Sequence, residues 1–167
     1  MLIAIISDVH NNEVNLKKVL DYCQENNIST IICCGDLASE ETLKFVSKNF
    51  TGTFYYVFGN MDRDQNRDAD FSKKHENLKI FPGFGEALLD KNKVAFVHYP
   101  NIAKELCESK NYSFVFYGHT HKPWEEKIGR CKMLNPGNVT GDFYPPTFAV
   151  WNTENDKFEL IRVHELM

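Results

Sequence analysis

Five short runs of apolar residues constrain the fold of this chain more than any other feature of its sequence. The runs span residues 3–6, 31–34, 54–58, 94–97 and 114–117. Each is four or five residues long and apolar throughout, which is typical of a strand buried on both faces of a sheet. None approaches the ~20 residues that a membrane-spanning helix requires. We therefore expect a core built on β-sheets.

The segments between the first three runs carry helix signals. In residues 13–27, four apolar positions recur at the spacing of one helix face, and Asn11 or Asn12 can cap the first turn. A shorter helix is expected over residues 40–48. Apolar strands that alternate with helices are typical of a parallel sheet covered on both faces.

The second half of the chain adds more strands and one more helix. Residues 61–77 are rich in Asp, Arg, Lys and Asn, and we expect an exposed loop or a short helix there. Strands are then expected at 78–81, 86–89 and 94–97, a hairpin turn at 90–93, a helix at 102–109, and short strands within 127–163 with turns at 135–138 and 152–156. Because there is no internal repeat or linker, residues 1–167 are expected to form one domain of two packed mixed sheets with helices outside.

Charge and cysteine content narrow the class of protein. A net charge of −4 argues against a protein that coats nucleic acid, although bound cations would still allow a phosphate-bearing substrate. The five cysteines are odd in number and show no Cys-X-X-Cys spacing, so neither a disulfide framework nor a structural zinc site is expected. Cys33 and Cys34 are expected to be buried thiols, which suits a reducing cytoplasm. Ser7 and Asp8 interrupt the apolar N-terminus too early for a signal peptide.

Side chains that can bind metal ions stand directly after the apolar runs. They are Asp8, His10, Asp36, Asn60, His98, His119 and His121. Open α/β sheets place their ligands outside the carboxyl ends of their strands, so these residues are expected to meet at one edge. Such a set can hold two divalent cations a few ångströms apart, the usual device for clamping and attacking a phosphoester. Asp8 and His10 are expected on the same side of an extended segment.

Each of these elements also has a simpler explanation when it is taken alone. An isolated Gly-Asp pair such as 35–36 is more often a helix cap, and Gly-Asn at 59–60 is a frequent turn pair. However, four of the six histidines fall at predicted strand ends, and this clustering favours a shared metal site. Residues 135–138 could be only a turn. Residues 143–146 (Phe-Tyr-Pro-Pro) could line a substrate entrance, but local packing is the preferred interpretation.

In this order, the motifs resemble those of the calcineurin-like metallophosphoesterase superfamily. They are Asp-X-His at 8–10, Gly-Asp at 35–36, Gly-Asn-X-Asp at 59–62, His98, and Gly-His-Thr-His at 118–121. The small size and Asn-Pro-Gly at 135–137 resemble its compact YfcE/MJ0936-like phosphodiesterase branch. The resemblance implies an α/β fold, a four-layer αββα sandwich with two mixed β-sheets.

The resemblance also implies roles for the candidate residues. Asp8, His10 and His121 would hold a first divalent metal ion, Asn60, His98 and His119 a second, and Asp36 would bridge the two. Mn²⁺, Ni²⁺, Fe or Zn²⁺ suits this mixed nitrogen and oxygen ligand set. A hydroxide that bridges the metals would attack phosphorus in line. Arg63, a further candidate catalytic residue beside Asp36 and Asn60, could bind a substrate phosphate or pair with Asp62 or Asp64.

Two departures from the superfamily pattern bear on the chemistry. Many members carry a histidine after Gly-Asn that protonates the leaving group, whereas Met61 has no proton to give. This favours good leaving groups such as aryl esters, or protonation by solvent. Tyr99-Pro100 also replaces the Gly-His pair that is common after the strand-terminal histidine.

The implied function is hydrolysis of small phosphodiesters, with phosphomonoesters and nucleotide derivatives among the candidates. The alternative is a protein-binding scaffold that resembles the retromer subunit Vps29 and keeps residual metal binding. The presence of all seven ligand positions favours the enzyme. Long nucleic acid is not an expected partner, because there is no basic stripe to follow a backbone. No membrane partner is expected either, and a homodimer remains open because compact relatives often pair.

Overall fold

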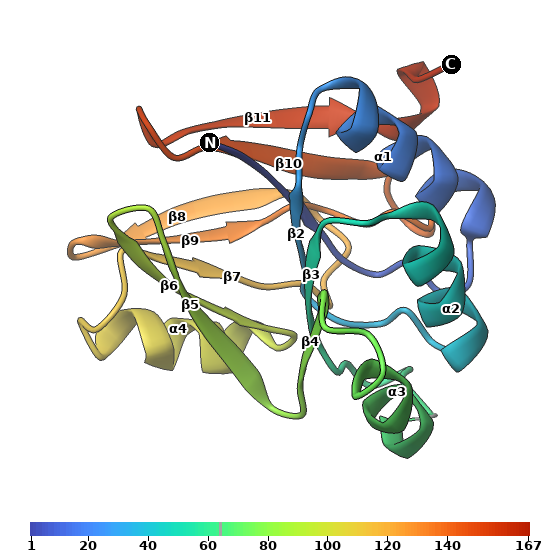
Figure 1. Ribbon diagram of the computed structural model, residues 1–167. Helices are drawn as coiled ribbons and strands as arrows, with labels where there is room; N and C mark the ends of the chain where they lie inside the picture. Colours follow the sequence, from blue (N-terminus) through green and yellow to red (C-terminus); the bar gives the residue numbers. More distant parts are fainter. Residues whose placement is uncertain (64) are drawn as a thin grey trace.

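The computed structural model describes residues 1–63 and 65–167, and two β-sheets packed face to face dominate it (Figure 1). The six-stranded sheet has the spatial order β11 (Lys157–Arg162), β10 (Thr147–Asn152), β1 (Leu2–Ile6), β2 (Thr30–Cys33), β3 (Thr53–Val57) and β4 (Leu78–Phe81). The five-stranded sheet has the order β5 (Phe84–Leu89), β6 (Asn92–Val97), β7 (Phe114–Phe116), β9 (Cys131–Asn135) and β8 (Trp124–Ile128). The helices are α1 (Glu13–Glu25), α2 (Glu40–Asn49), α3 (Gln65–Ser72) and α4 (Pro100–Glu108), followed by a 3-10 helix at Val163–Glu165.

Both sheets are mixed, and each has a parallel centre. Strands β1 to β4 are parallel to one another, and β10 and β11 add antiparallel pairs at one side. In the other sheet β6, β7 and β9 are parallel, whereas β5 and β8 are antiparallel edge strands. The predicted α/β sandwich of two mixed sheets is therefore confirmed.

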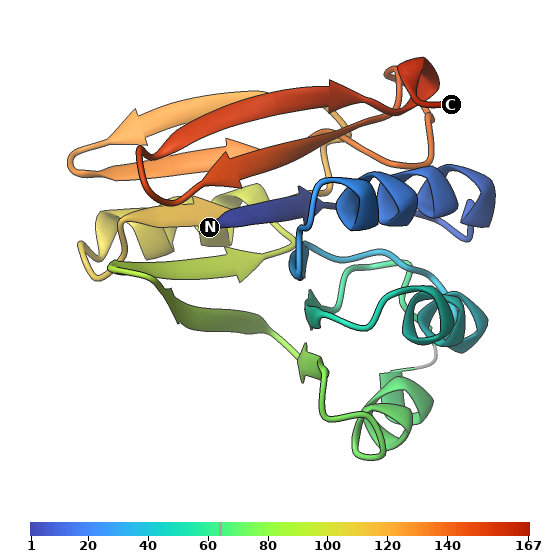
Figure 2. The same ribbon diagram turned by 45° about the horizontal axis from the view of Figure 1, so that its top comes forward.

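Helices cover the outer face of each sheet, which gives four layers. In both views α1, α2 and α3 lie on one side of the molecule and α4 on the other (Figures 1 and 2). Alternate residues of β1 serve different cores: Ala4 and Ile6 pack beneath α1 and α2, whereas Ile3 and Ile5 pack between the sheets. A third core lies under α4. This double burial is the reason why the central strands are apolar throughout.

The expected elements are present, with shifts at their ends. The helix expected at 102–109 begins two residues earlier, at Pro100, since proline is accepted in a first helical turn. Asn12 is the cap of α1, where its side chain accepts a hydrogen bond from the Asn15 amide. Within the polar stretch 61–77 the structure has the short helix α3. No helix of the described residues is long and apolar enough to cross a membrane.

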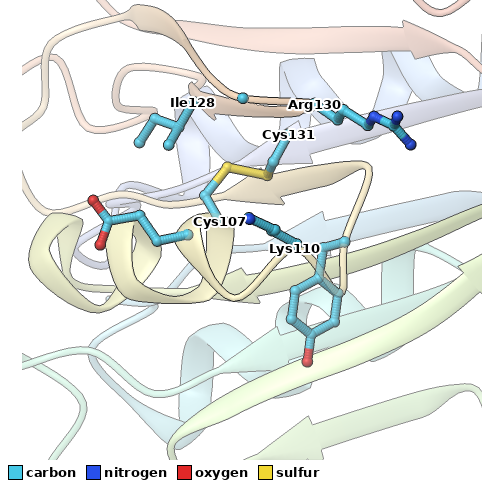
Figure 3. A pocket seen from close by; sticks show the side chains of 8 residues that line it. Cys107, Lys110, Ile128, Arg130 and Cys131 are labelled. Carbon is cyan, nitrogen blue, oxygen red and sulfur yellow. A yellow bond between two sulfur atoms is a disulfide. The ribbon is translucent and has the colours of Figure 1, made fainter.

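No disulfide framework was expected, and one disulfide bond that the sequence did not predict is present. Cys107 in α4 and Cys131 at the start of β9 form this bond, whereas Cys33 and Cys34 are free and buried as expected, and Cys23 is free and buried too. The two bonded residues are 24 positions apart and carry no motif, so only the packing of α4 on β9 brings them together. A cavity of about 550 Å³ lies beside the bond (Figure 3). It is at the amino end of β9, the opposite end of the sheet from the predicted ligands.

Candidate metal centre

The candidate site forms where the carboxyl ends of the parallel strands of both sheets meet. The loops that leave these strands are joined by backbone hydrogen bonds. The Asp8 amide donates to the Gly35 carbonyl, the Gly118 amide to the His98 carbonyl, and the Thr140 amide to the Asp8 carbonyl. Because of these bonds the loops form one platform that spans both sheets, and all seven predicted ligand side chains lie on it.

One group of ligand side chains gathers around Asp8. Its Oδ1 atom lies 3.3 Å from Nε2 of His121 and 3.6 Å from Nε2 of His10. The carboxylate is completely buried, and its other oxygen accepts a hydrogen bond from the His119 amide. We refer to Asp8, His10 and His121 as the first ligand set.

A second ligand set consists of Asn60, His98 and His119. Asn60 Oδ1 lies 2.9 Å from His119 Nδ1 and 3.0 Å from His98 Nε2. The two imidazole nitrogens are themselves 3.2 Å apart. Three potential ligand atoms, one from the six-stranded sheet and two from the other, therefore point at a common position.

Asp36 lies between the two sets. Its Oδ2 atom is 3.4 Å from His10 Nε2 in the first set and 3.4 Å from His98 Nε2 in the second. Its Oδ1 atom accepts a hydrogen bond of 2.8 Å from the Met61 amide, which orients the carboxylate. One carboxylate is thus positioned to serve both groups of ligands.

The donor atoms fit divalent cations. Asp8 Oδ1 and His10 Nε2 are buried, and neither has a hydrogen-bond partner among residues 1–63 and 65–167. Leaving buried polar atoms unpaired is costly, particularly for an ionised carboxylate. A cation held between carboxylate and imidazole atoms would remove this cost, and such a mixed set is suited to first-row transition metals.

Hydrogen bonds to the far ring nitrogens orient two of the histidines. His98 donates from Nδ1 to the Cys34 carbonyl at 2.8 Å, and His121 donates from Nδ1 to the Asp142 carbonyl at 3.2 Å. Since a carbonyl can only accept, the proton of each neutral ring is on Nδ1 and the lone pair is on Nε2. In both residues Nε2 is the atom that faces the carboxylates, as in metal-binding histidines generally.

The backbone of the site is unusual and corrects one expectation. Asp8, His10, Asp36, His119 and His121 all have φ between +47° and +69°. This left-handed region is uncommon for residues other than glycine, and such residues cluster at functional sites. Strand β1 ends at Ile6, so Asp8 and His10 do not share one side of an extended segment as expected. Left-handed turns bring their side chains together instead.

The glycines of the motifs provide space for the ligand side chains. A Cβ atom on Gly59 would lie 2.1 Å from Asp36 Oδ1, and one on Gly118 would lie 1.9 Å from Ser7 Oγ. Gly35, at φ +105°, allows the turn between β2 and Asp36. Any larger residue at the first two positions would displace a carboxylate or the loop that carries one.

The acidic and basic side chains around the first ligand set shift one another's pKa values. Burial by itself would raise the pKa of Asp8, but its interactions with His10 and His121 outweigh burial and hold that pKa well below its usual range. The Asp36 and Asp8 carboxylates raise the pKa of His10 to about 10, and Asp8 also raises the pKa of His121. Without metal, this set therefore retains protons at neutral pH, and a bound cation would displace them.

Sequence reasoning missed the role of Asp62. This buried carboxylate accepts hydrogen bonds from the amides of Asp36, Ala38 and Gly59, at 2.8, 2.7 and 2.6 Å. It ties the loop after β2 to the loop after β3 and so positions both Asp36 and Asn60. The only signal in the sequence is its place as the last residue of Gly-Asn-Met-Asp.

Asn135 and Asn138 also do more than form a turn, as was left open. Both are buried. Asn135 donates from Nδ2 to the Gly118 carbonyl, and Asn138 donates from Nδ2 to the His121 carbonyl. These two amides hold the loop that carries His119 and His121.

Among the described residues, Arg63 has no hydrogen bond or ion pair with the two ligand sets or Asp36. Its side chain is exposed, and both oxygens of the neighbouring Asp62 are engaged by backbone amides. Among the residues that the structure describes, no ion pair of Arg63 with Asp62 is found. The alternative partner, Asp64, lies outside the described residues.

The fold and the cluster together define a class: two stacked mixed sheets that carry a carboxylate–histidine centre at their joined carboxyl edge. The chain belongs to the calcineurin-like phosphoesterase superfamily, whose domain it matches over residues 1–156. It is similar to phosphodiesterase MJ0936 of Methanocaldococcus jannaschii, with 27% identity over 164 residues that cover 96% of this chain and 98% of the relative. The predicted compact branch is confirmed, and the chain is a hydrolytic enzyme of a family that uses divalent metal ions.

Solved structures agree with this assignment. A structure of an archaeal phosphodiesterase matches with a TM-score of 0.90 at 27% identity and covers 97% of this chain and 99% of that chain. YfcE, a phosphoesterase from E. coli, matches with a TM-score of 0.69 at 17% identity and coverage of 98% and 100%. Zinc-bound Vps29 from Entamoeba histolytica matches with a TM-score of 0.66 at 19% identity and coverage of 98% and 99%. The last two show likeness of fold alone.

Proposed function

We propose that this protein is a dinuclear metal-dependent phosphodiesterase that hydrolyses small phosphodiesters and, less readily, phosphomonoesters. The observation that carries the proposal is the position of Asp36, whose Oδ2 atom lies 3.4 Å from a histidine of each ligand set. A carboxylate between two convergent groups is the arrangement that two cations sharing one ligand require. The phosphodiesterase MJ0936, similar over nearly the whole chain, supports the substrate class.

Two divalent cations in this site would supply activation of the attacking water and neutralisation of charge on the phosphoryl oxygens. The chain itself contributes two buried carboxylates, Asp8 and Asp36, and otherwise neutral ligands. Two divalent cations would therefore leave the centre with net positive charge, which attracts a phosphodiester anion. The loops tied by Asp62 hold the ligands in place before the substrate arrives, so little reorganisation is needed.

The residues around the two ligand sets suggest which esters would react fastest. Met61 offers only its backbone amide, which is occupied by Asp36, so no side chain at this position can protonate a leaving alkoxide. We expect aryl esters to be preferred over alkyl esters for this reason. Arg63 is exposed three residues after Asn60, and we assign its guanidinium to a phosphate oxygen of the substrate, a geometry that suits arginine.

Hydrolysis of bis(p-nitrophenyl) phosphate and p-nitrophenyl phosphate by metal-stripped protein tests this function. Mn²⁺, Ni²⁺, Fe²⁺, Zn²⁺ or Mg²⁺ is added back singly, and bound metal is counted per chain. Asp36→Asn keeps the size of the side chain but removes the charge between the two sets. His164→Asn, on the exposed 3-10 helix, is the matched control.

We expect metal-dependent turnover of the diester, two bound ions per chain, and loss of turnover only in Asp36→Asn. One bound ion with full activity would refute the dinuclear centre. Folded protein that binds two ions but hydrolyses neither ester with any metal would refute the phosphodiesterase and favour the Vps29-like scaffold.

A further inference from the structure

An aromatic side chain stands exposed beside the first ligand set. Phe143 is 92% exposed, and its ring centroid lies 5.7 Å from that of His121, at an interplanar angle of 67°. For Phe143 this overturns the expectation that the Phe-Tyr-Pro-Pro segment packs locally, because apart from its contact with His121 the side chain lies almost entirely in solvent. A large exposed aromatic ring next to a candidate metal-binding residue is a candidate contact for the substrate.

The loop that carries Phe143 is fixed to the candidate metal centre. The amides of Val139 and Thr140 donate to the carbonyls of Ser7 and Asp8, and His121 donates to the Asp142 carbonyl. Asn138 accepts from the Gly141 amide and donates to the Tyr144 carbonyl, so it closes the loop from within. The backbone of the loop is therefore held at a defined place relative to Asp8 and His121.

The backbone at Phe143 supports the same interpretation. Phe143 has φ +65°, a left-handed conformation that bulky residues rarely adopt. Such conformations persist when the surroundings impose them, and they concentrate at ligand-binding segments. Here the strained residue presents its ring to solvent and contributes nothing to the core.

We propose that Phe143 is a specificity-determining residue that stacks on a planar aromatic substituent of the substrate, such as a nucleobase or an aryl ring, on the side of the first ligand set. This inference rests on the proposed phosphodiesterase function, because it names the substrate class of that site. Stacking on an open ring face accepts any planar π-system, so it selects aromatic over alkyl substituents without selecting one base.

Three diesters with the same leaving group test the proposal in the metal-loaded enzyme. They are methyl p-nitrophenyl phosphate, bis(p-nitrophenyl) phosphate and thymidine 5′-(p-nitrophenyl phosphate). Their chemistry at the leaving group is equal, and only the retained substituent differs. Phe143→Ala is expected to lower kcat/KM about tenfold for the two aromatic diesters, through KM, and less than about twofold for the methyl ester, as loss of one stacking ring implies.

Substitutions at the same position separate stacking from a structural role. Phe143→Trp is expected to retain the preference for aromatic substituents, whereas Phe143→Leu keeps an apolar side chain but is expected to lose it. Leu88→Ala, an exposed apolar truncation on β5, is the control and should change no substrate. An equal loss on all three diesters in Phe143→Ala would show that the residue only positions His121, and would overturn the proposal.

Binding of alkyl phosphomonoesters, which the enzyme is expected to hydrolyse slowly, distinguishes failure of this proposal from failure of the proposed function. Calorimetry on metal-loaded protein compares adenosine 5′-monophosphate with ribose 5-phosphate, which carry the same phosphate with and without a base. Wild-type protein is expected to bind the nucleotide about tenfold more tightly, and Phe143→Ala to bind both alike. Equal affinities in the wild type would overturn the stacking role. A preference for the nucleotide in a protein that hydrolyses no diester would support stacking while refuting the phosphodiesterase.

Discussion

The two ligand sets of the candidate metal centre differ in the charge of their oxygen ligand. In the first set, Asp8 Oδ1 and His10 Nε2 are buried without a hydrogen-bond partner among the described residues. The Asp36 and Asp8 carboxylates raise the pKa of His10, and Asp8 raises the pKa of His121. In the second set, the Asn60 carboxamide oxygen, which carries no charge, lies within 3.0 Å of His98 Nε2 and His119 Nδ1. From this contrast we expect the first set to attract a cation more strongly, in competition with protons.

The largest expected effect comes from removing the charge that belongs to the first set alone. Asp8→Asn is expected to reduce bound metal from two ions to one per chain and to lower diester hydrolysis by roughly 10²–10³-fold, the scale of losing one strong electrostatic contact in a transition state. Metal analysis after dialysis and initial rates measure this. Asp21→Asn, an exposed carboxylate paired with Lys17 on α1, is the control. Retention of two ions would show that the two sets do not differ as described.

Weakening the hydrogen bonds by which Asp62 joins the loops after β2 and β3 should affect both ligand sets. Asp62→Asn leaves one oxygen to accept from three backbone amides and points an N–H₂ group at the others. We expect metal affinity to fall about 10–100-fold at both positions, as for other residues that orient metal ligands. The free energy of unfolding of the metal-free protein should fall by about 1–3 kcal/mol. Calorimetric titration and urea unfolding measure the two effects, with Asp70→Asn on the exposed face of α3 as control.

The comparison also predicts an opposite pH dependence for stability and for metal binding. The folded-state pKa of His10 is raised to about 10, so the stability that it contributes is fully present below its unfolded pKa of about 6.5. That stability is lost as the pH rises from about 6.5 through 10. Thermal unfolding of chelated protein should show this fall in Tm, and His10→Asn should reduce it. A flat Tm in the wild type over that range would contradict the assignment.

Metal affinity, unlike stability, should rise with pH over the same range. Because the cation replaces protons on His10, affinity should rise by up to about tenfold per pH unit for each proton released, while the pH remains below 10. Calorimetry in buffers of different ionisation enthalpy counts the protons directly.

The smallest effect is expected from a substitution that makes the second set resemble the first. Asn60→Asp keeps the shape and the oxygen that faces His98 and His119 but adds a negative charge. We expect the second cation to bind about tenfold more tightly and turnover to fall several-fold, because added charge lowers the attraction for the phosphodiester anion. Asn60→Ala, which removes the oxygen, should weaken binding of that cation instead. If both variants weaken it equally, the charge of the set is not what limits its affinity.

The apolar runs were sufficient to predict the central strands because burial on both faces leaves a local signature, as Ala4 and Ile5 of β1 illustrate. The candidate ligand residues could be identified for a related reason, since each follows a strand end and belongs to an ordered set of motifs. The elements at the sheet margins were less certain. The start of β5 at Phe84 lacks a continuous apolar pattern, because one face of an edge strand lies in solvent.

What the sequence alone determined is therefore the α/β class, the position of the strands and the identity of the seven ligand candidates. Only the tertiary structure decided how Asp36 lies between two sets, that Asp62 ties their loops together, that Cys107 meets Cys131, and that Phe143 stands in solvent beside His121. The reason is physical. Strand burial and residue type are local properties of the chain, whereas left-handed turns and contacts between distant loops arise only when the two sheets pack and bring their carboxyl edges together.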